Sequence, residues 1–362
     1  MPEQRDLLDF IVVGAQKAGT STLFQYLRRH PEICIPALKE VPYFSHDTVY
    51  KRGWEAYMRE IGREQGTTDG VCKWGTVTPH YMVGGVYETA NETDEGGGYD
   101  ERTVPLRIHK RLHRVRLIAI LRNPVERAIS HHRMAVSIGR EKRSFDTSID
   151  HLLQPAMLER ARRRPQERMG YVVWGEYGRI LSGYFDVFPA EQILVVFTDE
   201  LERTPGLLMH RIHKFIGVMP DFEPPNLGAR YRVGKPERGF AWKDPSSWIS
   251  PSSPVSPQGV RRAIGRVPAA RALWDTLPPD SQRYLRLPYE RIEYRTARWN
   301  RDSTPNRVSA NAEPSLQTLE RLWEHYEEDR ERLAALTGLT PTWEAPRGTK
   351  IEDPHTADPA EG

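Results

Sequence analysis

The first apolar segment of the chain leads directly into a glycine turn and the start of a helix. Residues 10–13 read Phe-Ile-Val-Val, a short apolar run that is typical of a buried strand. A tight turn follows over residues 14–19, and residues 20–30 then carry apolar positions at helical spacing, among them Leu23 and Leu27. The pattern predicts a strand, a turn and a helix in immediate succession, with the helix ending before Pro31.

Similar alternation of apolar and amphipathic segments returns further along the chain. Residues 116–121 and 192–197 are apolar runs that read as buried parallel strands. Helical spacing is found over residues 54–65, 104–113, 124–136, 176–188, 205–216 and 316–336. Alternating strands and helices predict an α/β fold with a P-loop-type parallel sheet that is flanked by helices.

The chain lacks a clear linker. Its 362 residues could form two domains, but no proline- or glycine-rich segment divides them cleanly, so we expect a single domain over residues 1–343 with long loop insertions. Residues 84–102 are acidic and rich in glycine, which indicates a flexible loop. Residues 224–311 lose all periodicity and are expected to form a lid or an acceptor-binding insertion. Residues 344–362 are expected to be a disordered tail.

The first strand, turn and helix start together predict an anion-binding site. The first N–H groups of a helix have no partner within it, and the helix dipole favours negative charge at that end. Lys17 adds a full positive charge, while Thr20, Ser21 and Thr22 add hydroxyl donors. We therefore expect this segment to bind a phosphate group.

The turn differs from the loop of nucleoside triphosphatases, G-x-x-x-x-G-K-[ST]. Gly14 and Gly19 keep the spacing of that loop, but Thr20 stands where its lysine would be. The strand at residues 116–121 ends in Arg122 rather than in an aspartate that could hold magnesium. An arginine at that place indicates a second bound anion without a metal, which argues against a kinase or an ATPase.

Two segments resemble the donor-binding motifs of sulfotransferases that use 3′-phosphoadenosine-5′-phosphosulfate (PAPS). Residues 14–22 (GAQKAGTST) are similar to their 5′-phosphosulfate loop, and residues 121–130 (LRNPVERAIS) are similar to their 3′-phosphate motif. Residues 39–44 (KEVPYF) resemble the stretch in which the heparan-sulfate and related carbohydrate branch places its catalytic glutamate. Residues 78–81 and 198–201 follow in the expected order.

The resemblance implies transfer of a sulfuryl group from PAPS to a carbohydrate or natural-product acceptor, at a hydroxyl and less readily at an amine. Glu40 would act as general base, with its pKa raised by partial burial, and Lys17 would stabilise the leaving group. His46 and His80 are reserve bases. The residues implied in binding PAPS, with no metal ligand among them, are Gln16, Lys17, Ala18, Gly19, Thr20, Ser21, Thr22, Arg122 and Ser130.

One position departs from the heparan-type pattern. That branch carries Glu-Lys directly before its Thr/Ser-Pro, whereas Thr76-Val77 stand there in this chain. Lys73 could reach the site only by a different path. A heparan-like acceptor is therefore the weakest part of the resemblance.

Two other functional classes stay open from the sequence. One is a P-loop kinase or other NTPase, which would need magnesium; the other is a non-catalytic protein that binds a nucleotide or an anionic glycan. A net charge of only +3, without regular alternation of aromatic and basic residues, does not support a nucleic-acid partner. The oligomeric state is left open.

The cysteines and the apolar runs bear on the location of the protein. The first residues have no apolar signal-peptide core, and no run of about 18 apolar residues occurs. Cys34 and Cys72 offer no disulfide framework or metal spacing and are expected to be reduced. We therefore expect a soluble, cytoplasmic, bacterial member without a membrane partner. The pairs His109/His113 and His131/His132 are expected on helix surfaces.

Overall fold

The fold is described from a computed structural model for residues 8–36, 39–62, 72–86, 100–231 and 312–346. Apart from residues 134–142, these residues belong to one compact unit. The predicted loop at 84–102, insertion at 224–311 and tail at 344–362 lie mostly outside these ranges. The single-domain boundary at residue 343 therefore stays a prediction.

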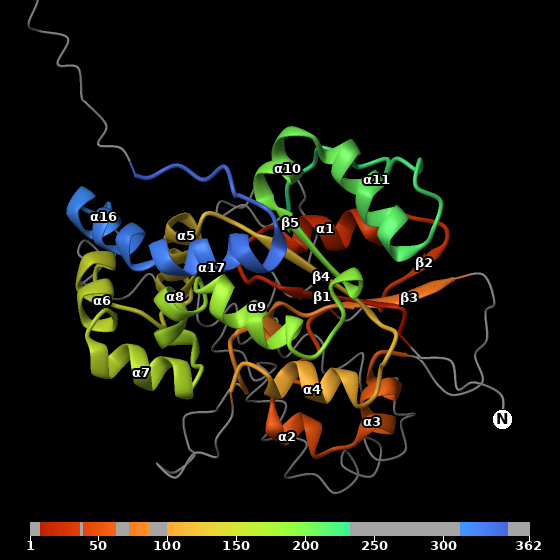
Figure 1. Cartoon of the computed structure of the whole chain (residues 1–362), viewed down its shortest axis with the longest axis horizontal. Helices are drawn as coiled ribbons and strands as arrows, with labels where there is room; N and C mark the ends of the chain where they lie inside the picture. The colour runs from red at the N-terminus through yellow and green to blue at the C-terminus, as the bar shows by residue number, and fades with distance from the viewer. Residues whose placement is uncertain (1–7, 37–38, 63–71, 87–99, 232–311, 347–362) are drawn as a thin grey trace, which may run out of the picture. The chain divides into compact units, whose positions relative to one another are not determined.

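Five parallel strands form one sheet in the order β2-β3-β1-β4-β5 (Figure 1). The strands are β1 Phe10–Gly14, β2 Ile33–Cys34, β3 Lys73–Val77, β4 Arg116–Leu121 and β5 Ile193–Phe197. The α/β class and the parallel sheet are confirmed, and so are the strands expected at β1, β4 and β5. The pattern did not indicate β2 and β3, because β2 has only two residues and β3 reads Lys-Trp-Gly-Thr-Val without a continuous apolar run.

The register of the sheet places the ends of its central strands together. Val12 of β1 lies opposite Val77 of β3 on one side and opposite Ile118 of β4 on the other. On the far side of β4, Leu121 lies opposite Phe197 of β5. Because all strands are parallel, their carboxyl ends meet at one edge of the sheet, the edge at which α/β proteins bind ligands.

Helices cover both faces of the sheet (Figure 1). Those that contain or contact residues of the site described below include α1 Thr20–Leu27, α5 Pro124–Ser137 and α10 Thr198–Arg203, with the 3-10 helices η1 Pro79–Met82 and η2 Glu167–Met169. The remaining helices are α2 Asp47–Tyr50, α3 Trp54–Glu60, α4 Thr103–His109, α6 Phe145–Leu152, α7 Pro155–Arg163, α8 Gly170–Val173, α9 Tyr177–Phe185, η3 Ala190–Gln192, α11 Pro205–Ile216, α16 Leu316–His325 and α17 Glu327–Thr337.

The side chains of β1 alternate between two apolar layers. Phe10 and Val12 pack with residues of α1 and α11, such as Leu23 and Ile212. Ile11 belongs to the opposite layer, with residues of α3, α4 and α9. Strands that are covered on both faces must be apolar throughout, which explains why β1, β4 and β5 were visible in the sequence.

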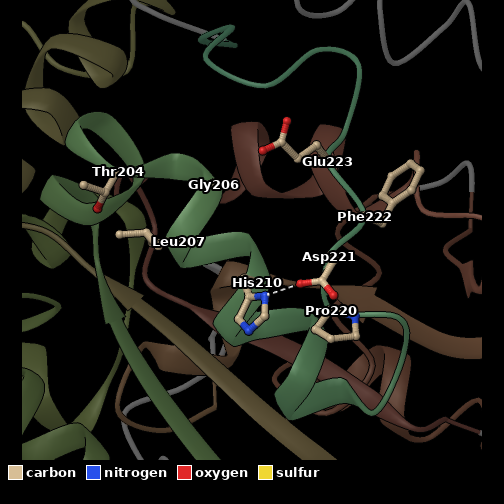
Figure 2. Close-up of a pocket in the computed structure, with 8 residues that line it drawn as sticks. All are labelled: Thr204, Gly206, Leu207, His210, Pro220, Asp221, Phe222 and Glu223. Atoms are coloured by element: carbon tan, nitrogen blue, oxygen red, sulfur yellow. Dashed lines mark ion pairs between the residues drawn. The ribbon is translucent and has the colours of Figure 1, made fainter.

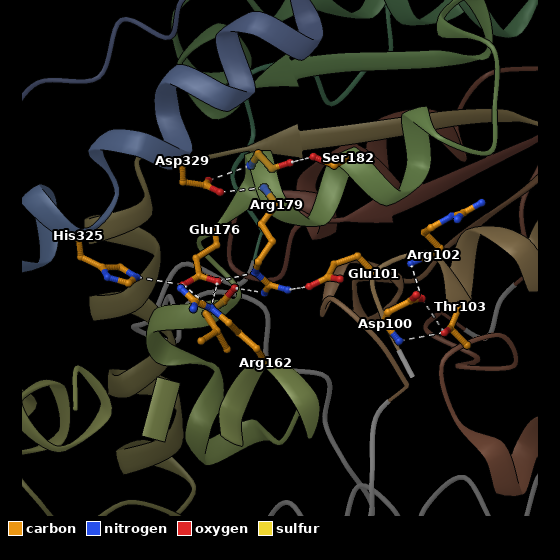
Figure 3. Close-up of polar contacts among 12 residues, drawn as sticks. Asp100, Glu101, Arg102, Thr103, Arg162, Glu176, Arg179, Ser182, His325 and Asp329 are labelled. Carbon is orange, nitrogen blue, oxygen red and sulfur yellow. Dashed lines mark hydrogen bonds and ion pairs between the residues drawn. The ribbon is translucent and has the colours of Figure 1, made fainter. Parts of the chain in front are cut away.

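The predicted helix at 316–336 is two helices that meet at Tyr326. This side chain is fully buried, and its hydroxyl donates to the carbonyl of Val172, 2.8 Å away. Past the junction, the carboxylate of Asp329 in α17 accepts the backbone N–H groups of Gly178 and Arg179 at 2.8 Å each, at the start of α9 (Figure 3). The leucine spacing continues through both helices, so it could not reveal the break.

A buried carboxylate ties several of these segments together (Figure 3). The side chain of Glu176 is only 3% exposed and pairs with Arg162 at 2.8 Å, Arg179 at 2.5 Å and His325 at 3.0 Å. Arg179 also pairs with Glu101 before α4. Burial opposes the charge of Glu176, but the hydrogen bonds from His325 and Arg162 lower the pKa of this carboxyl to about 2.

The expectation of two reduced cysteines is wrong in this structure. Cys34 and Cys72 form a disulfide with their Cα atoms 5.9 Å apart. The physical reason is the unpredicted pairing of β2 with β3, which sets Cys34 opposite Trp74, close to Cys72. The cytoplasmic location rested partly on reduced cysteines and loses that support.

Candidate functional site

The predicted phosphate loop connects β1 to α1 at the carboxyl edge of the sheet. Gly19 has a φ of +97°, in the left-handed region, and a Cβ atom there would lie 3.0 Å from Leu201 in α10. The positive φ favours glycine at this position, and a Cβ atom would also make the Leu201 side chain shift slightly. Thr20 and Ser21 begin α1, where backbone N–H groups have no intrahelical acceptor, as the predicted anion site requires. The binding of an anion there stays a prediction.

Thr198 fixes the loop to the neighbouring strands. Its hydroxyl, at the start of α10, lies 2.7 Å from the carbonyl oxygen of Ala18 and 3.1 Å from that of Leu121. The backbone N–H of Ala15 donates to Ile120 at 2.8 Å. The sequence placed residues 198–201 only in the order of a resemblance; the structure gives Thr198 a direct contact with the loop.

Two lysines belong to this region. Lys17 lies within the loop with a φ of +69°, and its side chain is half-buried. Lys39, which the sequence did not single out, pairs with Glu40 and lies 3.4 Å through Nζ from the hydroxyl of Ser21. The only feature of the sequence that could have drawn attention to Lys39 is its position directly before Glu40. Lys39 brings a second cation to the start of α1.

Glu40 is attached to the end of β3, next to β1. Its backbone N–H donates to the carbonyl of Val77 at 3.2 Å, and the carbonyl of Val41 accepts the hydroxyl of Tyr81 at 2.9 Å. The Glu40 side chain is 28% exposed, so the expected partial burial is present. Through the pair with Lys39 it lies close to the loop; its role as a base stays a prediction.

Arg122 follows β4 at the same edge, and the structure gives it a carboxylate partner. Its guanidinium pairs with Glu126 through two contacts of 2.8 and 3.0 Å, with 31% of the side chain exposed. The side chain of Asn123 accepts the N–H of Val125 at 3.0 Å, which confirms it as the cap of α5. Ser130 is half-buried further along α5.

Two loop residues already use their side chains inside the protein. The amide of Gln16 donates to Glu167 at 3.0 Å, and the hydroxyl of Thr22 accepts the backbone N–H of Tyr231 at 3.2 Å. Ala18 has no polar side chain. These three residues can therefore offer an anion their backbone more readily than their side chains.

Lys73 does not reach the loop. It opens β3 at the amino edge of the sheet, and its Nζ pairs with Asp9 at 2.9 Å, at the start of β1. The carboxyl end of the same strand leads to Thr78, whose backbone N–H donates to Val12. The two positions are separated by the length of the strand, so Lys73 is not a residue of this site.

The reserve bases lie near each other. The rings of His46 and His80 are 6.1 Å apart. Burial, with the neighbouring charge of His80, lowers the pKa of His46 to about 4. His46 is therefore neutral and weakly basic at pH 7, which favours Glu40 as the group to test first.

A buried cluster beside the loop was not foreseen. His131 and His132 were expected on a helix surface, but their exposed fractions are 0% and 2%. α8 covers this side of α5, and the ring of His131 stacks on Trp174, 5.1 Å away. His131 also contacts Glu167 at 3.2 Å, the carboxylate that holds Gln16. These contacts could not be predicted from local sequence patterns, because Glu167 is 36 residues from His131 and 151 from Gln16.

A surface pocket lies at the start of α11 (Figure 2). It contains none of the predicted site residues and is lined by Thr204, Gly206, Leu207, His210, Pro220, Asp221, Phe222 and Glu223. His210 and Asp221 pair within it at 3.1 Å. The residues predicted to bind an anion lie instead at the carboxyl edge of the sheet.

These residues place cationic groups at two neighbouring strand ends of an α/β fold, the arrangement that was predicted for a phosphate-binding site. One position is the loop, with Lys17 and Lys39; the other is Arg122, where a magnesium-dependent P-loop enzyme would carry a carboxylate. Among the residues that the structure describes, no group of three or more His, Cys, Asp and Glu side chains could hold a metal ion.

Comparison with known proteins assigns the family. A family model described as a sulfotransferase domain matches residues 7–227, more than half of the 362 residues. The chain therefore belongs to the sulfotransferase domain family, which confirms the resemblance on residues 14–22 and 121–130.

The curated relatives include enzymes named for heparan sulfate. Human heparan sulfate glucosamine 3-O-sulfotransferase 6 is 29% identical over 218 residues, which are 60% of this chain and 54% of that protein. The human bifunctional heparan sulfate N-deacetylase/N-sulfotransferase 2 is 26% identical over 215 residues, 58% of this chain and 22% of that protein. The matched region thus spans about half of the first relative and less of the second.

One solved structure is similar to this chain at a comparable level of sequence identity. The sulfotransferase from Alicyclobacillus acidocaldarius is 28% identical, with a TM-score of 0.48, over 62% of this chain and 87% of that one. Within the described ranges, none of the helices has the length and apolar character needed to cross a membrane.

Proposed function

We propose that this protein is a PAPS-dependent sulfotransferase that acts on a hydroxyl group of a carbohydrate or natural-product acceptor. The observation that carries the proposal is the arrangement at the carboxyl edge of the sheet. The predicted phosphate loop follows β1, carries Lys17 and is contacted at Ser21 by Lys39. Arg122 follows β4, and Glu40 is attached to the end of β3.

The donor set fits a nucleotide with phosphate groups at two separate positions. Gln16, Lys17, Ala18, Gly19, Thr20, Ser21 and Thr22 would hold the 5′-phosphosulfate, largely through backbone N–H groups and Lys17. Arg122 and Ser130 would hold the 3′-phosphate, which distinguishes PAPS from ATP. Arg122 would then exchange its exposed partner Glu126 for the phosphate, a charge-assisted pair of the same kind.

The proposed reaction needs no covalent intermediate. The acceptor oxygen forms a bond to sulfur as the bond from sulfur to the 5′-phosphate oxygen breaks, and adenosine 3′,5′-bisphosphate (PAP) leaves. Glu40 takes the proton of the acceptor hydroxyl, and Lys17 neutralises the charge that develops on the phosphate oxygen. Lys39 holds the Glu40 carboxylate near the loop.

Labelled PAPS tests the reaction. Transfer of labelled sulfuryl groups is measured on heparan sulfate oligosaccharides and on a panel of small hydroxylated compounds. Glu40→Gln keeps the shape but removes the base, so we expect transfer to fall by about 100-fold or more. Glu60→Gln is the matched control, because Glu60 lies in α3 and pairs with Arg52. Equal transfer by wild type and Glu40→Gln would remove Glu40 from the mechanism.

The identity of the acceptor and the cellular location of the protein are separate proposals. The heparan sulfate acceptors are named for the relatives, and this chain carries Thr76-Val77 where that branch carries Glu-Lys. We therefore propose a carbohydrate or natural-product hydroxyl without committing to heparan sulfate. The cytoplasmic location stays a prediction that fractionation can test.

A further inference from the structure

Glu167 is a largely buried carboxylate that contacts both the phosphate loop and α5. Its side chain is 12% exposed and lies in η2, far in sequence from either partner. Oε1 accepts the Gln16 amide at 3.0 Å and lies 3.2 Å from Nε2 of His131. The mechanism proposed above gives Glu167 and His131 no part, although both adjoin the loop.

The chemistry of the partners sets the direction of each hydrogen bond at His131. Arg127 can only donate, and its guanidinium lies 3.4 Å from Nδ1 of His131. The carboxylate of Glu167 can only accept, so Nε2 of His131 carries the proton. Burial lowers the pKa of His131 to about 4, which agrees with a neutral ring that accepts on one side and donates on the other.

The contacts form a continuous chain from α5 to the loop. Arg127 is fully buried and is itself held by the carbonyls of Gly170, at 3.1 Å, and Tyr171, at 2.5 Å. From Arg127 the chain passes through His131 and Glu167 to Gln16. Each link is a hydrogen bond between groups with little or no access to water, so movement at one end is resisted at the other.

This series of hydrogen bonds extends from one proposed phosphate site to the other. Gln16 lies in the 5′-phosphosulfate loop, and His131 directly follows Ser130, the proposed ligand of the 3′-phosphate. We propose that Glu167 is a positioning residue that holds the phosphate loop in register with α5, and so sets the spacing between the two phosphate sites. This inference rests on the proposed function.

The charges around Glu167 make this role stable near neutral pH. The ionisable groups that face the cluster are His131, His80 with Nε2 4.0 Å from Oε2, Arg127, and Lys17, whose charge acts on His131. Burial opposes ionisation, but the hydrogen bonds from His131 and Gln16 lower the pKa of Glu167 to about 2. The carboxylate therefore stays ionised at pH 5–8, so its hydrogen bonds to His131 and Gln16 do not change with pH in this range.

A double-mutant cycle tests the inference by calorimetric titration with PAP and with adenosine 5′-monophosphate. Glu167→Ala leaves two buried donors unpaired, so we expect PAP affinity to fall about tenfold. The loss should be smaller for the monophosphate, which needs only one of the two sites. Gln16→Ala should cost a similar factor, and the double variant should lose no more than the larger single loss.

Conservative variants separate positioning from general destabilisation. Glu167→Gln keeps an oxygen that can accept both hydrogen bonds, so PAP affinity should stay within about threefold of wild type. Glu176→Ala removes another buried carboxylate and should lower thermal stability without changing PAP affinity at temperatures where the variant is folded. If Glu167→Ala does not fold, Gln16→Glu should weaken PAP binding by charge repulsion, and adding Glu167→Gln should restore it.

Three results would overturn the inference. They are unchanged PAP affinity in Glu167→Ala, losses that add independently in the double variant, and equal losses for PAP and the monophosphate. A wild type that binds no PAP would overturn the proposed function and this inference together. Tight PAP binding by wild type with any of the three results rejects only the role of Glu167.

Discussion

The Thr198 hydroxyl lies 2.7 Å from the carbonyl oxygen of Ala18, which precedes it by 180 residues in the chain. The contact holds the phosphate loop against the start of α10, and the same hydroxyl lies 3.1 Å from the carbonyl of Leu121 at the end of β4. One buried side chain therefore connects three strand ends of the site.

Removing that hydroxyl should loosen the loop. Thr198→Val leaves two buried carbonyls without this partner, at a cost of about 1–3 kcal/mol, and we expect PAP affinity to fall about fivefold or more. Thr198→Ser keeps the hydroxyl and should bind like wild type. Calorimetry on both variants checks this; a serine variant as weak as the valine variant would assign the effect to packing.

Gly19 provides a second test of the loop. An alanine there would adopt an unfavourable left-handed conformation, at about 1–2 kcal/mol, and would also press on Leu201. Gly62→Ala is the matched control, since Gly62 has a φ of +77° with nothing within 4 Å of the added methyl group. Both variants should lose stability in thermal unfolding, but only Gly19→Ala should lose PAP affinity. Loss of affinity in both would contradict the assigned role of Gly19.

Glu176 should make stability depend on acid pH. Its folded pKa of about 2 lies below the unfolded value of about 4.3, so its contribution is complete above pH 4.3. That contribution, on the order of 3 kcal/mol, is lost as the pH falls from about 4.3 through about 2.

Thermal unfolding between pH 2 and pH 7 measures this contribution. Glu176→Gln should unfold several degrees below wild type at pH 7, and the difference should shrink toward pH 2. Glu159→Gln, which alters an exposed pair with Arg163, should match wild type throughout. A difference between wild type and Glu176→Gln that is constant with pH would contradict the assignment.

The disulfide predicts a response to reductant. Cys34 and Cys72 are 38 residues apart, so closing this loop is expected to add up to about 4 kcal/mol to the free energy of unfolding. Reductant should therefore lower the unfolding midpoint of wild type but not that of the Cys34→Ser/Cys72→Ser variant. Thiol titration of protein unfolded without reductant should find no free thiol; two free thiols would refute the pairing.

The strands and helices that could be predicted from the sequence are those with an uninterrupted apolar run or a regular helical spacing of apolar residues. β1, β4 and β5 are covered on both faces and are apolar apart from Arg116 at the start of β4, and Pro205–Ile216 carries its helical spacing from end to end. β3 was missed because Lys73 and Gly75 interrupt its apolar character. The disulfide was missed for the same reason, since it follows from the pairing of β3 with β2.

The site was predictable in its backbone more than in its side chains. The glycine turn, the start of α1 and Arg122 at the end of β4 were foreseen because each has a signal within a few residues. Glu167 and Gln16 are 151 residues apart, and no local pattern relates them. Burial of His131 depends likewise on the packing of Trp174 against α5.

The central claim is that the two neighbouring strand ends bind a nucleotide with separate 5′ and 3′ phosphate groups and without a metal. The most direct measurement is calorimetric titration of PAP and of ADP in the presence of EDTA, on wild type and on Arg122→Ala. The account predicts tight, metal-free binding of PAP, much weaker binding of ADP, and loss of PAP affinity by about tenfold or more in Arg122→Ala. Equal binding of ADP and PAP, or binding that requires magnesium, would contradict it and favour a P-loop kinase instead.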